Sequence, residues 1–194
     1  MFDKPMPTNL FDYVQVYNNI LSPELCKEIE GHLELAEWDR HEYFSPKEDN
    51  SVSFEDDLYV TYKANNMENK LTALMWSCIY KYVVEFLTPF TNDWFNGWKN
   101  YALVRFNKYP QGSRMKVHCD HIHSLFEGPH KGIPILTILG AINDNYEGGE
   151  LIICGEKVPL MAGSVVIFPS NFLYPHEVKP VTSGTRYSYV TWAW

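Results

Sequence analysis

The chain has 194 residues, a size typical of one domain, and its 45% hydrophobic content is sufficient for a packed core. Its formal net charge of -8 argues against a general phosphate-binding surface, and no run approaches the ~18 apolar residues that span a bilayer. The first residues lack the basic and apolar regions of a signal peptide, and the four cysteines form no CxxC pair, so we expect a cytoplasmic protein with reduced thiols.

The predicted elements of the first half begin with a strand over residues 11–17, where apolar and polar side chains alternate. A helix is predicted over residues 22–36, because serine suits the N-cap and the proline that follows suits the first helical position. Residues 39–57 are charged and polar, which predicts a loop. A short strand is expected over residues 58–63.

A second helix is predicted between residues 71 and 87, where apolar side chains recur every three or four positions. We interpret this apolar stripe as core rather than as a cofactor site. From Trp98 onward the predicted strands are short and are separated by Gly, Pro or Asn turns. We therefore expect a mainly β protein of one domain over residues 1–194. In it, a double-stranded β-helix (jelly roll) over 98–194 would be buttressed on one sheet by the helices of 1–97.

The tripeptide His118-Cys119-Asp120 is the most informative motif. Side chains at i and i+2 of a strand leave the same face, so His118 and Asp120 could hold one metal ion while Cys119 points away. His176, on a remote strand, would complete a set of two imidazoles and one carboxylate that leaves open positions on Fe(II). An isolated HxD motif is weak evidence, because a solvated aspartate on a surface strand gives the same pattern. The prediction therefore depends on the surrounding sequence.

The surrounding sequence resembles the iron(II)- and 2-oxoglutarate-dependent oxygenases, particularly a small bacterial or phage-type member of their prolyl 4-hydroxylase-like branch. Together the matching segments cover roughly residues 98–194, and the first half of the chain carries little of the signature. The segments are Tyr109-Pro110-Gln111-Gly112, the hairpin Asn143-Asp144-Asn145-Tyr146-Glu147-Gly148-Gly149-Glu150-Leu151, the turn and strand Met161-Ala162-Gly163-Ser164-Val165-Val166-Ile167-Phe168-Pro169, and the closing pattern from His176 through Arg186-Tyr187-Ser188 to Trp192.

The resemblance implies a dioxygenase in which His118, Asp120 and His176 bind Fe(II). Such an enzyme consumes 2-oxoglutarate and O2, hydroxylates an aliphatic C–H bond and releases succinate and CO2, with ascorbate as a supporting reductant. Arg186 would bind the distal carboxylate of 2-oxoglutarate, since a buried guanidinium requires a carboxylate partner. Intact ligands and an intact arginine argue against a catalytically dead scaffold.

Three further residues have a role in the family and a structural alternative. Ser188, two residues after the arginine on the same strand face, could hydrogen-bond the cosubstrate or be simply a small strand residue. Tyr109 occupies a position whose phenol often reaches the cosubstrate, but a core tyrosine is the alternative. Trp192 resembles a tryptophan that some prolyl hydroxylases place near the iron, and core packing would explain it equally well.

Peptidyl proline is the substrate that the resemblance favours, although another residue of a peptide or protein, or a small molecule, stays open. Two departures weaken a specific prolyl-hydroxylase assignment: Met115 and Ala141 stand where many relatives carry a tyrosine that helps bind the cosubstrate. A nucleic-acid substrate is not expected, because the chain is acidic and Trp192 stands where a demethylase would have a second arginine. The oligomeric state is left open.

A cupin-type metal-binding protein or isomerase is the alternative interpretation. His121, His123 and Glu127 match the pattern HxH(x)3E, and His176 would complete that ligand set. Cupins, however, need no arginine after the last histidine. We expect instead that His121 and His123 are not ligands of the iron. A polar loop over residues 121–131 would then lie at the site entrance, and its part from about Ser124 to Lys131 would contact substrate.

Overall fold

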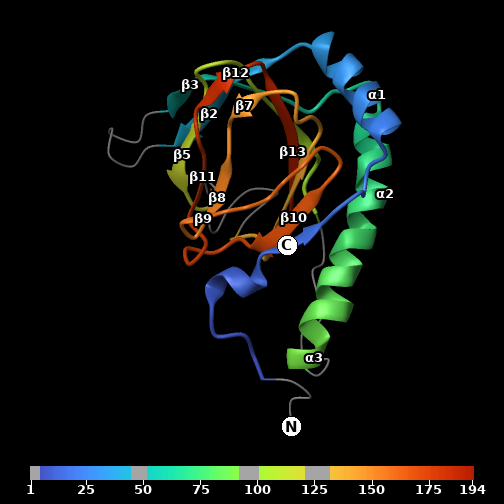
Figure 1. The fold of residues 1–194 in the computed structure, drawn as a ribbon, viewed down its shortest axis with the longest axis vertical. Coiled ribbons are helices and arrows are strands. Elements are labelled where there is room, and N and C mark those ends of the chain that lie inside the picture. The colour runs from blue at the N-terminus through green and yellow to red at the C-terminus, as the bar shows by residue number, and fades with distance from the viewer. Residues whose placement is uncertain (1–4, 45–51, 92–100, 121–131) are drawn as a thin grey trace.

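In a computed structural model that describes residues 5–44, 52–91, 101–120 and 132–194, two antiparallel sheets form a barrel with helices along one side (Figure 1). Within these residues the larger sheet has, in spatial order, β1 (Gln15–Tyr17), β10 (Val165–Pro169), β6 (Leu136–Ala141), β13 (Arg186–Ala193), β4 (Arg105–Tyr109), β3 (Val52–Thr61) and β2 (Asp39–Phe44). The smaller sheet has β5 (Met115–His118), β11 (His176–Val178), β8 (Leu151–Ile153) and β9 (Glu156–Lys157), while β12 (Val181–Ser183) pairs with β7 (Glu147–Gly148). The predicted jelly roll is confirmed.

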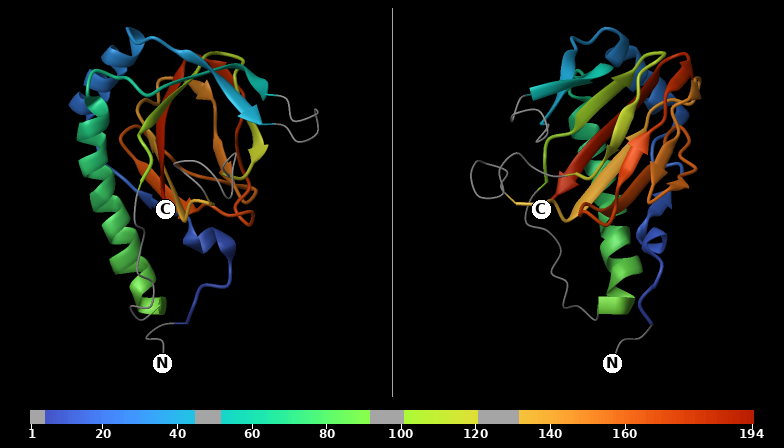
Figure 2. Two further views of the ribbon diagram at one scale, coloured as in Figure 1. Left: turned by 180° about the vertical axis from the view of Figure 1, so that it is seen from behind. Right: turned by 90° about the vertical axis from the view of Figure 1, so that its left-hand side faces the viewer.

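Helices α1 (Pro23–Glu34) and α2 (Met67–Tyr80) and the π-helical segment η2 (Lys81–Leu87) pack against the larger sheet, as predicted. The remaining helices are η1 (Leu10–Tyr13, 3-10) and α3 (Thr88–Thr91). Figure 2 shows α2 running alongside the barrel, and the helical segments that follow it, η2 and α3, reaching past the sheets. Ser22 Oγ accepts a hydrogen bond from the Leu25 backbone N–H at 3.2 Å, which confirms the predicted N-cap of α1. Among the described residues no helix has the length and apolar character needed to cross a membrane.

The core has two layers that share the larger sheet. The layer between this sheet and the helices includes Ile29, Leu33, Leu71, Met75, Phe106, Tyr187 and Tyr189. The layer inside the barrel includes Leu58, Tyr109, Leu139, Phe168, Val178 and Val190. Nearly all of the predicted apolar stripe of the second helix packs in the first layer, which confirms that it is core.

Alternation along β13 decides which of its side chains reach the barrel interior. Tyr187 and Tyr189 pack toward the helices, so Arg186, Ser188 and Trp192 point between the two sheets. The same alternation holds in β4, where Phe106 faces the helices and Tyr109 faces the barrel. β4 therefore adds a second row of side chains to the interior of the barrel.

Gly140 provides room for a tyrosine in the helix-side layer. It stands opposite Tyr189 in the ladder between β6 and β13, and a Cβ on Gly140 would overlap the phenol ring of that fully buried tyrosine. We therefore expect Gly140→Ala to lower the free energy of unfolding by about 1–3 kcal/mol in urea titrations. Gly31→Ala in α1 is the control, because an added methyl meets nothing within 4 Å there and should be neutral or stabilising. Equal effects at the two glycines would contradict this account.

Two predictions for the first half are wrong. Residues 11–17 do not form one strand, since η1 ends at Tyr13 and β1 begins at Gln15. The segment 39–57, predicted as a loop, contains β2 and much of β3. Residues 45–51, between these two strands, lie outside the described residues. β2 is an edge strand of the larger sheet, and β3, its neighbour, pairs with β4 only over residues 59–61. Polar and charged side chains are common at such an edge, and backbone pairing there needs no apolar pattern. The assignment of residues 1–194 to one domain stays a prediction.

Candidate metal centre

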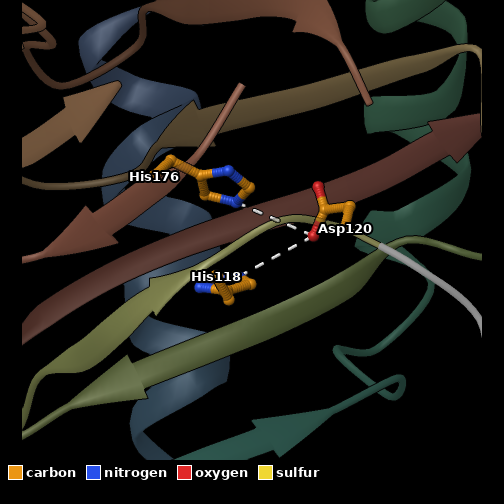
Figure 3. A group of neighbouring side chains, drawn as sticks. All are labelled: His118, Asp120 and His176. Carbon is orange, nitrogen blue, oxygen red and sulfur yellow. Dashed lines mark ion pairs between the residues drawn. The ribbon is translucent and has the colours of Figure 1, made fainter. Parts of the chain in front are cut away.

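The strand pairing in the smaller sheet brings the two histidines side by side. His118, the last residue of β5, stands directly opposite His176, the first residue of β11, and their ring centroids are 4.3 Å apart. Asp120 lies two residues beyond β5, so the prediction that it shares a strand with His118 is wrong. Its carboxylate nevertheless turns toward both rings: Oδ1 is 3.8 Å from His118 Nε2 and 3.7 Å from His176 Nε2 (Figure 3).

The orientation of both imidazoles suits a metal ligand. His118 Nδ1 is 2.8 Å from the Lys116 backbone carbonyl, and His176 Nδ1 is 3.0 Å from the Tyr174 carbonyl. Because a carbonyl can only accept, each Nδ1 donates its N–H, and each Nε2 is the ring nitrogen that faces Asp120. One donor atom from each of the three residues lies within 4.8 Å of the others. Two imidazoles and one carboxylate around one point fit an Fe(II) ion and leave positions for other ligands.

The electrostatic environment keeps these groups in the states that bind metal. Burial, with a contribution from His176, lowers the pKa of His118 to about 4, so its ring is neutral near pH 7. Burial alone would raise the pKa of Asp120, but His176, His118 and hydrogen bonding outweigh it and lower that pKa below its usual value. A neutral donor ring and an ionised carboxylate therefore coexist at neutral pH.

We expect the metal-free protein to lose stability as the pH falls. Burial lowers the pKa of His118 to about 4 and that of His41, on β2, to about 3, whereas unfolding returns both toward about 6.5. The unfolded chain then binds more protons below about pH 6.5, so the free energy of unfolding is highest above that pH and falls toward pH 4. Linkage limits the slope to about 1.4 kcal/mol per pH unit per proton, and solvent around partly exposed rings makes it smaller.

Urea unfolding of the metal-free protein between pH 7 and pH 5 measures this slope. A His41→Gln variant, which leaves the three candidate ligands intact, should show a shallower decline. A decline that is unchanged in this variant would remove His41 from the account.

Two buried hydroxyl groups support the Asp120 carboxylate through its second oxygen, Oδ2. Thr137 Oγ1, on β6, donates to Asp120 Oδ2 at 2.6 Å and lies 2.5 Å from Ser170 Oγ, just after β10. Both residues are almost fully buried. The Trp192 indole N–H also faces the carboxylate, without reaching full hydrogen-bonding geometry. Sequence reasoning missed Thr137 and Ser170, although a polar residue amid a buried apolar strand was an available signal.

Removing the supporting hydroxyl should weaken the metal centre without removing a ligand. Thr137→Val keeps the shape of the side chain but frees Asp120 Oδ2, so Fe(II) affinity should fall about 10–100-fold in anaerobic titrations. Thr191→Val is the matched control, because Thr191 is equally buried but donates to the Ala102 carbonyl at 2.6 Å instead. Similar losses of Fe(II) affinity in both variants would indicate general destabilisation rather than support of the ligand.

Arg186 is a buried cation that has no carboxylate partner in the described part of the chain. Its side chain is 1% exposed, Nη1 donates to Ser188 Oγ at 3.0 Å, and Cζ lies 4.9 Å from the centre of the Tyr109 ring. Nε is buried with no hydrogen bond, and among the described residues no carboxylate lies within ion-pair distance of the guanidinium. A buried guanidinium in this state fits a carboxylate-bearing cosubstrate. The structure thus brings Arg186, Ser188 and Tyr109 together, as predicted, and their roles stay a proposal.

Comparison with known proteins bears mainly on the C-terminal half. Residues 104–194 match the model of the 2OG-Fe(II) oxygenase superfamily. This part of the chain is therefore similar to the members of that superfamily. A PKHD-type hydroxylase from Shewanella sp. (strain ANA-3) is 38% identical over 92 residues, which cover 45% of this chain and 40% of that protein. The chain spans about two fifths of the length of the curated relatives it matches.

Solved structures extend the likeness of the oxygenase fold to nearly the whole chain. A prolyl hydroxylase from Trichoplax adhaerens, in complex with a hypoxia inducible factor peptide fragment, has a TM-score of 0.66 at 18% identity, covering 94% of this chain and 83% of that one. A Pseudomonas putida prolyl-4-hydroxylase has a TM-score of 0.63 at 18% identity, covering 93% and 91%. These likenesses confirm the predicted fold.

The oxygenase assignment favours the predicted ligand set over the cupin alternative. Among the described residues, the group able to hold a metal ion is that of His118, Asp120 and His176. His121, His123, Glu127 and the predicted substrate loop lie outside the described residues. Their exclusion from the iron site, and the contact of the loop with substrate, therefore stay predictions.

The two departures from the oxygenase pattern lie in the barrel core. Met115 is 8% exposed and packs inside the barrel, and Ala141 stands opposite Ser188 in the ladder between β6 and β13. Neither side chain carries a hydroxyl. Ser188 and Tyr109 are therefore the hydroxyl-bearing side chains that the described contacts place against Arg186.

Proposed function

We propose that this chain is a 2-oxoglutarate-dependent hydroxylase that uses Fe(II) and O2 to hydroxylate an aliphatic C–H bond, releasing succinate and CO2. The observation that carries the proposal is that one barrel holds a three-residue metal centre and a buried guanidinium with no carboxylate partner among the described residues. The superfamily match over residues 104–194 supports the same chemistry.

Each residue then has a defined task. His118, Asp120 and His176 would hold the iron, with Thr137 fixing the carboxylate that faces it. The iron supplies the oxidation of the C–H bond. Arg186 is hydrogen-bonded to Ser188 and lies over the Tyr109 ring. It would bind the distal carboxylate of 2-oxoglutarate bidentately and so position the cosubstrate relative to the metal centre. The apolar interior of the barrel would limit the access of water.

We propose a peptidyl residue, with proline as the first choice, as the group that is hydroxylated. Two observations support this choice: relatives over the C-terminal half are named PKHD-type hydroxylases, and the solved structures that share the fold include prolyl hydroxylases, one in complex with a peptide fragment.

The test is to incubate the Fe(II)-loaded protein with 2-oxoglutarate and a host-cell lysate in air, with and without ascorbate. Mass spectrometry should find peptides or metabolites with one added oxygen atom, together with succinate. An Asp120→Ala protein treated in the same way is the control. Succinate and oxygen incorporation that do not exceed this control would refute the proposed function.

A further inference from the structure

The interior face of β4 carries a second arginine, at the opposite end from the predicted cosubstrate site. Arg105 and Tyr109 lie on the same face of this strand, and the ladder places them opposite Val190 and Arg186, respectively. Four residues of strand separate the two ends, a distance of roughly 13 Å. Arg186 is fully buried, whereas Arg105 is partly exposed and lies at the more open end of the row.

The guanidinium of Arg105 is held in place by two neighbours. Its Nε donates to Asn107 Oδ1 at 3.1 Å, and Asn107 is itself 2% exposed. Its Cζ lies 5.0 Å from the centre of the Trp192 ring, so the indole face fixes the position of the guanidinium. The indole N–H of the same tryptophan faces the metal ligand Asp120. Arg105 is thus one side chain away from the metal centre.

No described residue neutralises this cation. Among the described residues no carboxylate lies within ion-pair distance of Arg105, and the ionisable groups near it are imidazoles. Those are His118 and His41, and the Nδ1 atom of His41 is buried without a hydrogen bond. When Fe(II) and 2-oxoglutarate are bound, the charges of the iron, the cosubstrate, Asp120 and Arg186 sum to zero. Arg105 would then be a positive charge beside the reacting centre that no carboxylate of the described residues compensates.

We infer that Arg105 is a specificity-determining residue that binds a carboxylate group of the substrate. With Nε engaged by Asn107, its two terminal amino groups remain to donate a pair of parallel hydrogen bonds, a geometry that matches a carboxylate. Because Asn107 and Trp192 already fix the guanidinium, little side-chain freedom is lost when an anion binds. The inference rests on the proposed function and narrows its substrate class to acids.

Two sources of the carboxylate have the same chemistry. One is the side chain of an acidic residue near the hydroxylated position, and the other is the carboxylate at the end of a peptide or of a free amino acid. Blocked proline peptides carrying glutamate or glutamine at successive positions around the proline probe the first source. Proline peptides without acidic side chains, ending in a free carboxylate or an amide, probe the second.

Binding of these probes is measured by calorimetry on the protein loaded with Fe(II) and 2-oxoglutarate in the absence of O2. For one of the two carboxylate sources, the peptide that carries the carboxylate should bind the parent protein about tenfold or more tightly than the same peptide with an amide in its place. Arg105→Gln should abolish this preference for the acid peptide while leaving the affinity for the amide peptide unchanged. Lys108→Gln is the matched control, because it removes one cation from the same strand on the opposite face, where Lys108 lies over Trp38.

Three outcomes would overturn the inference. The first is that the acid peptides and their amide counterparts bind alike, or do not bind, for both carboxylate sources. The second is that the preference for the acid peptide survives Arg105→Gln. The third is that Lys108→Gln loses the preference equally, which would indicate a general electrostatic effect. The proposed function is checked separately, by succinate formation in air with the same preparation. The anaerobic comparison needs no turnover, so failure of one proposal is distinguishable from failure of the other.

Discussion

Replacing Asp120 with alanine is expected to abolish Fe(II) binding and 2-oxoglutarate turnover. The carboxylate is the group that faces both imidazoles, at 3.8 Å and 3.7 Å, and without it two imidazole rings remain to hold a divalent ion. Loss of a supporting hydrogen bond alone reduces metal affinity about 10–100-fold, so loss of a direct ligand should exceed ~100-fold. Anaerobic Fe(II) titration and succinate formation provide the two measurements.

Asp12→Ala, which removes an exposed carboxylate from η1, is the matched control and should behave like the parent protein. Thermal melting of the metal-free variants separates loss of a ligand from loss of the fold. If the Asp120→Ala protein consumes 2-oxoglutarate with iron at the parental rate, the assignment of the metal centre is wrong.

Arg186→Lys should weaken 2-oxoglutarate binding by about 1.5–3 kcal/mol, roughly 10–150-fold. Lysine keeps the positive charge but loses the planar pair of donors that Ser188 and the Tyr109 ring hold in position. Iron affinity should change far less, since the guanidinium is not among the candidate ligands. Calorimetric titration of 2-oxoglutarate into the anaerobic Fe(II) protein measures the effect.

Arg114→Lys, at an exposed position before β5, controls for the loss of a guanidinium elsewhere and should leave the affinity unchanged. Unchanged 2-oxoglutarate affinity in Arg186→Lys would show that the carboxylate binds elsewhere, with Lys116 as the next candidate.

The sequence was sufficient for the parts of the site that short motifs encode. His118, Asp120 and His176 were predicted from their residue types and from the segments around them, and the structure brings them together. One step of that reasoning was wrong, because β5 ends at His118 and Asp120 reaches the site from beyond the strand. The motif constrains which atoms meet more strongly than it constrains the local backbone.

What the sequence could not give depends on which strands lie side by side. The support of Asp120 by Thr137 and Ser170 requires the pairing of β6 with β10, two strands whose contact no local pattern encodes. Arg105 likewise stands out only in three dimensions, because no carboxylate of the described residues lies within ion-pair distance of it. β2 and β3 were missed because strands at or next to a sheet edge that are rich in charged residues resemble loops when only composition is considered.

The packing of Gly140 against Tyr189 has a consequence for the opposite face of the sheet. Successive residues of β13 alternate between faces, so a slip of one position would turn Arg186 toward the helices and Tyr187 into the barrel. A bulky ring that occupies the space left by the missing side chain of Gly140 on the neighbouring strand disfavours such a slip. The alignment of Arg186 is thus encoded partly behind the sheet, among residues of the helix-side layer. Mutations confined to the helix-side layer could therefore misplace Arg186 while every residue of the site is retained.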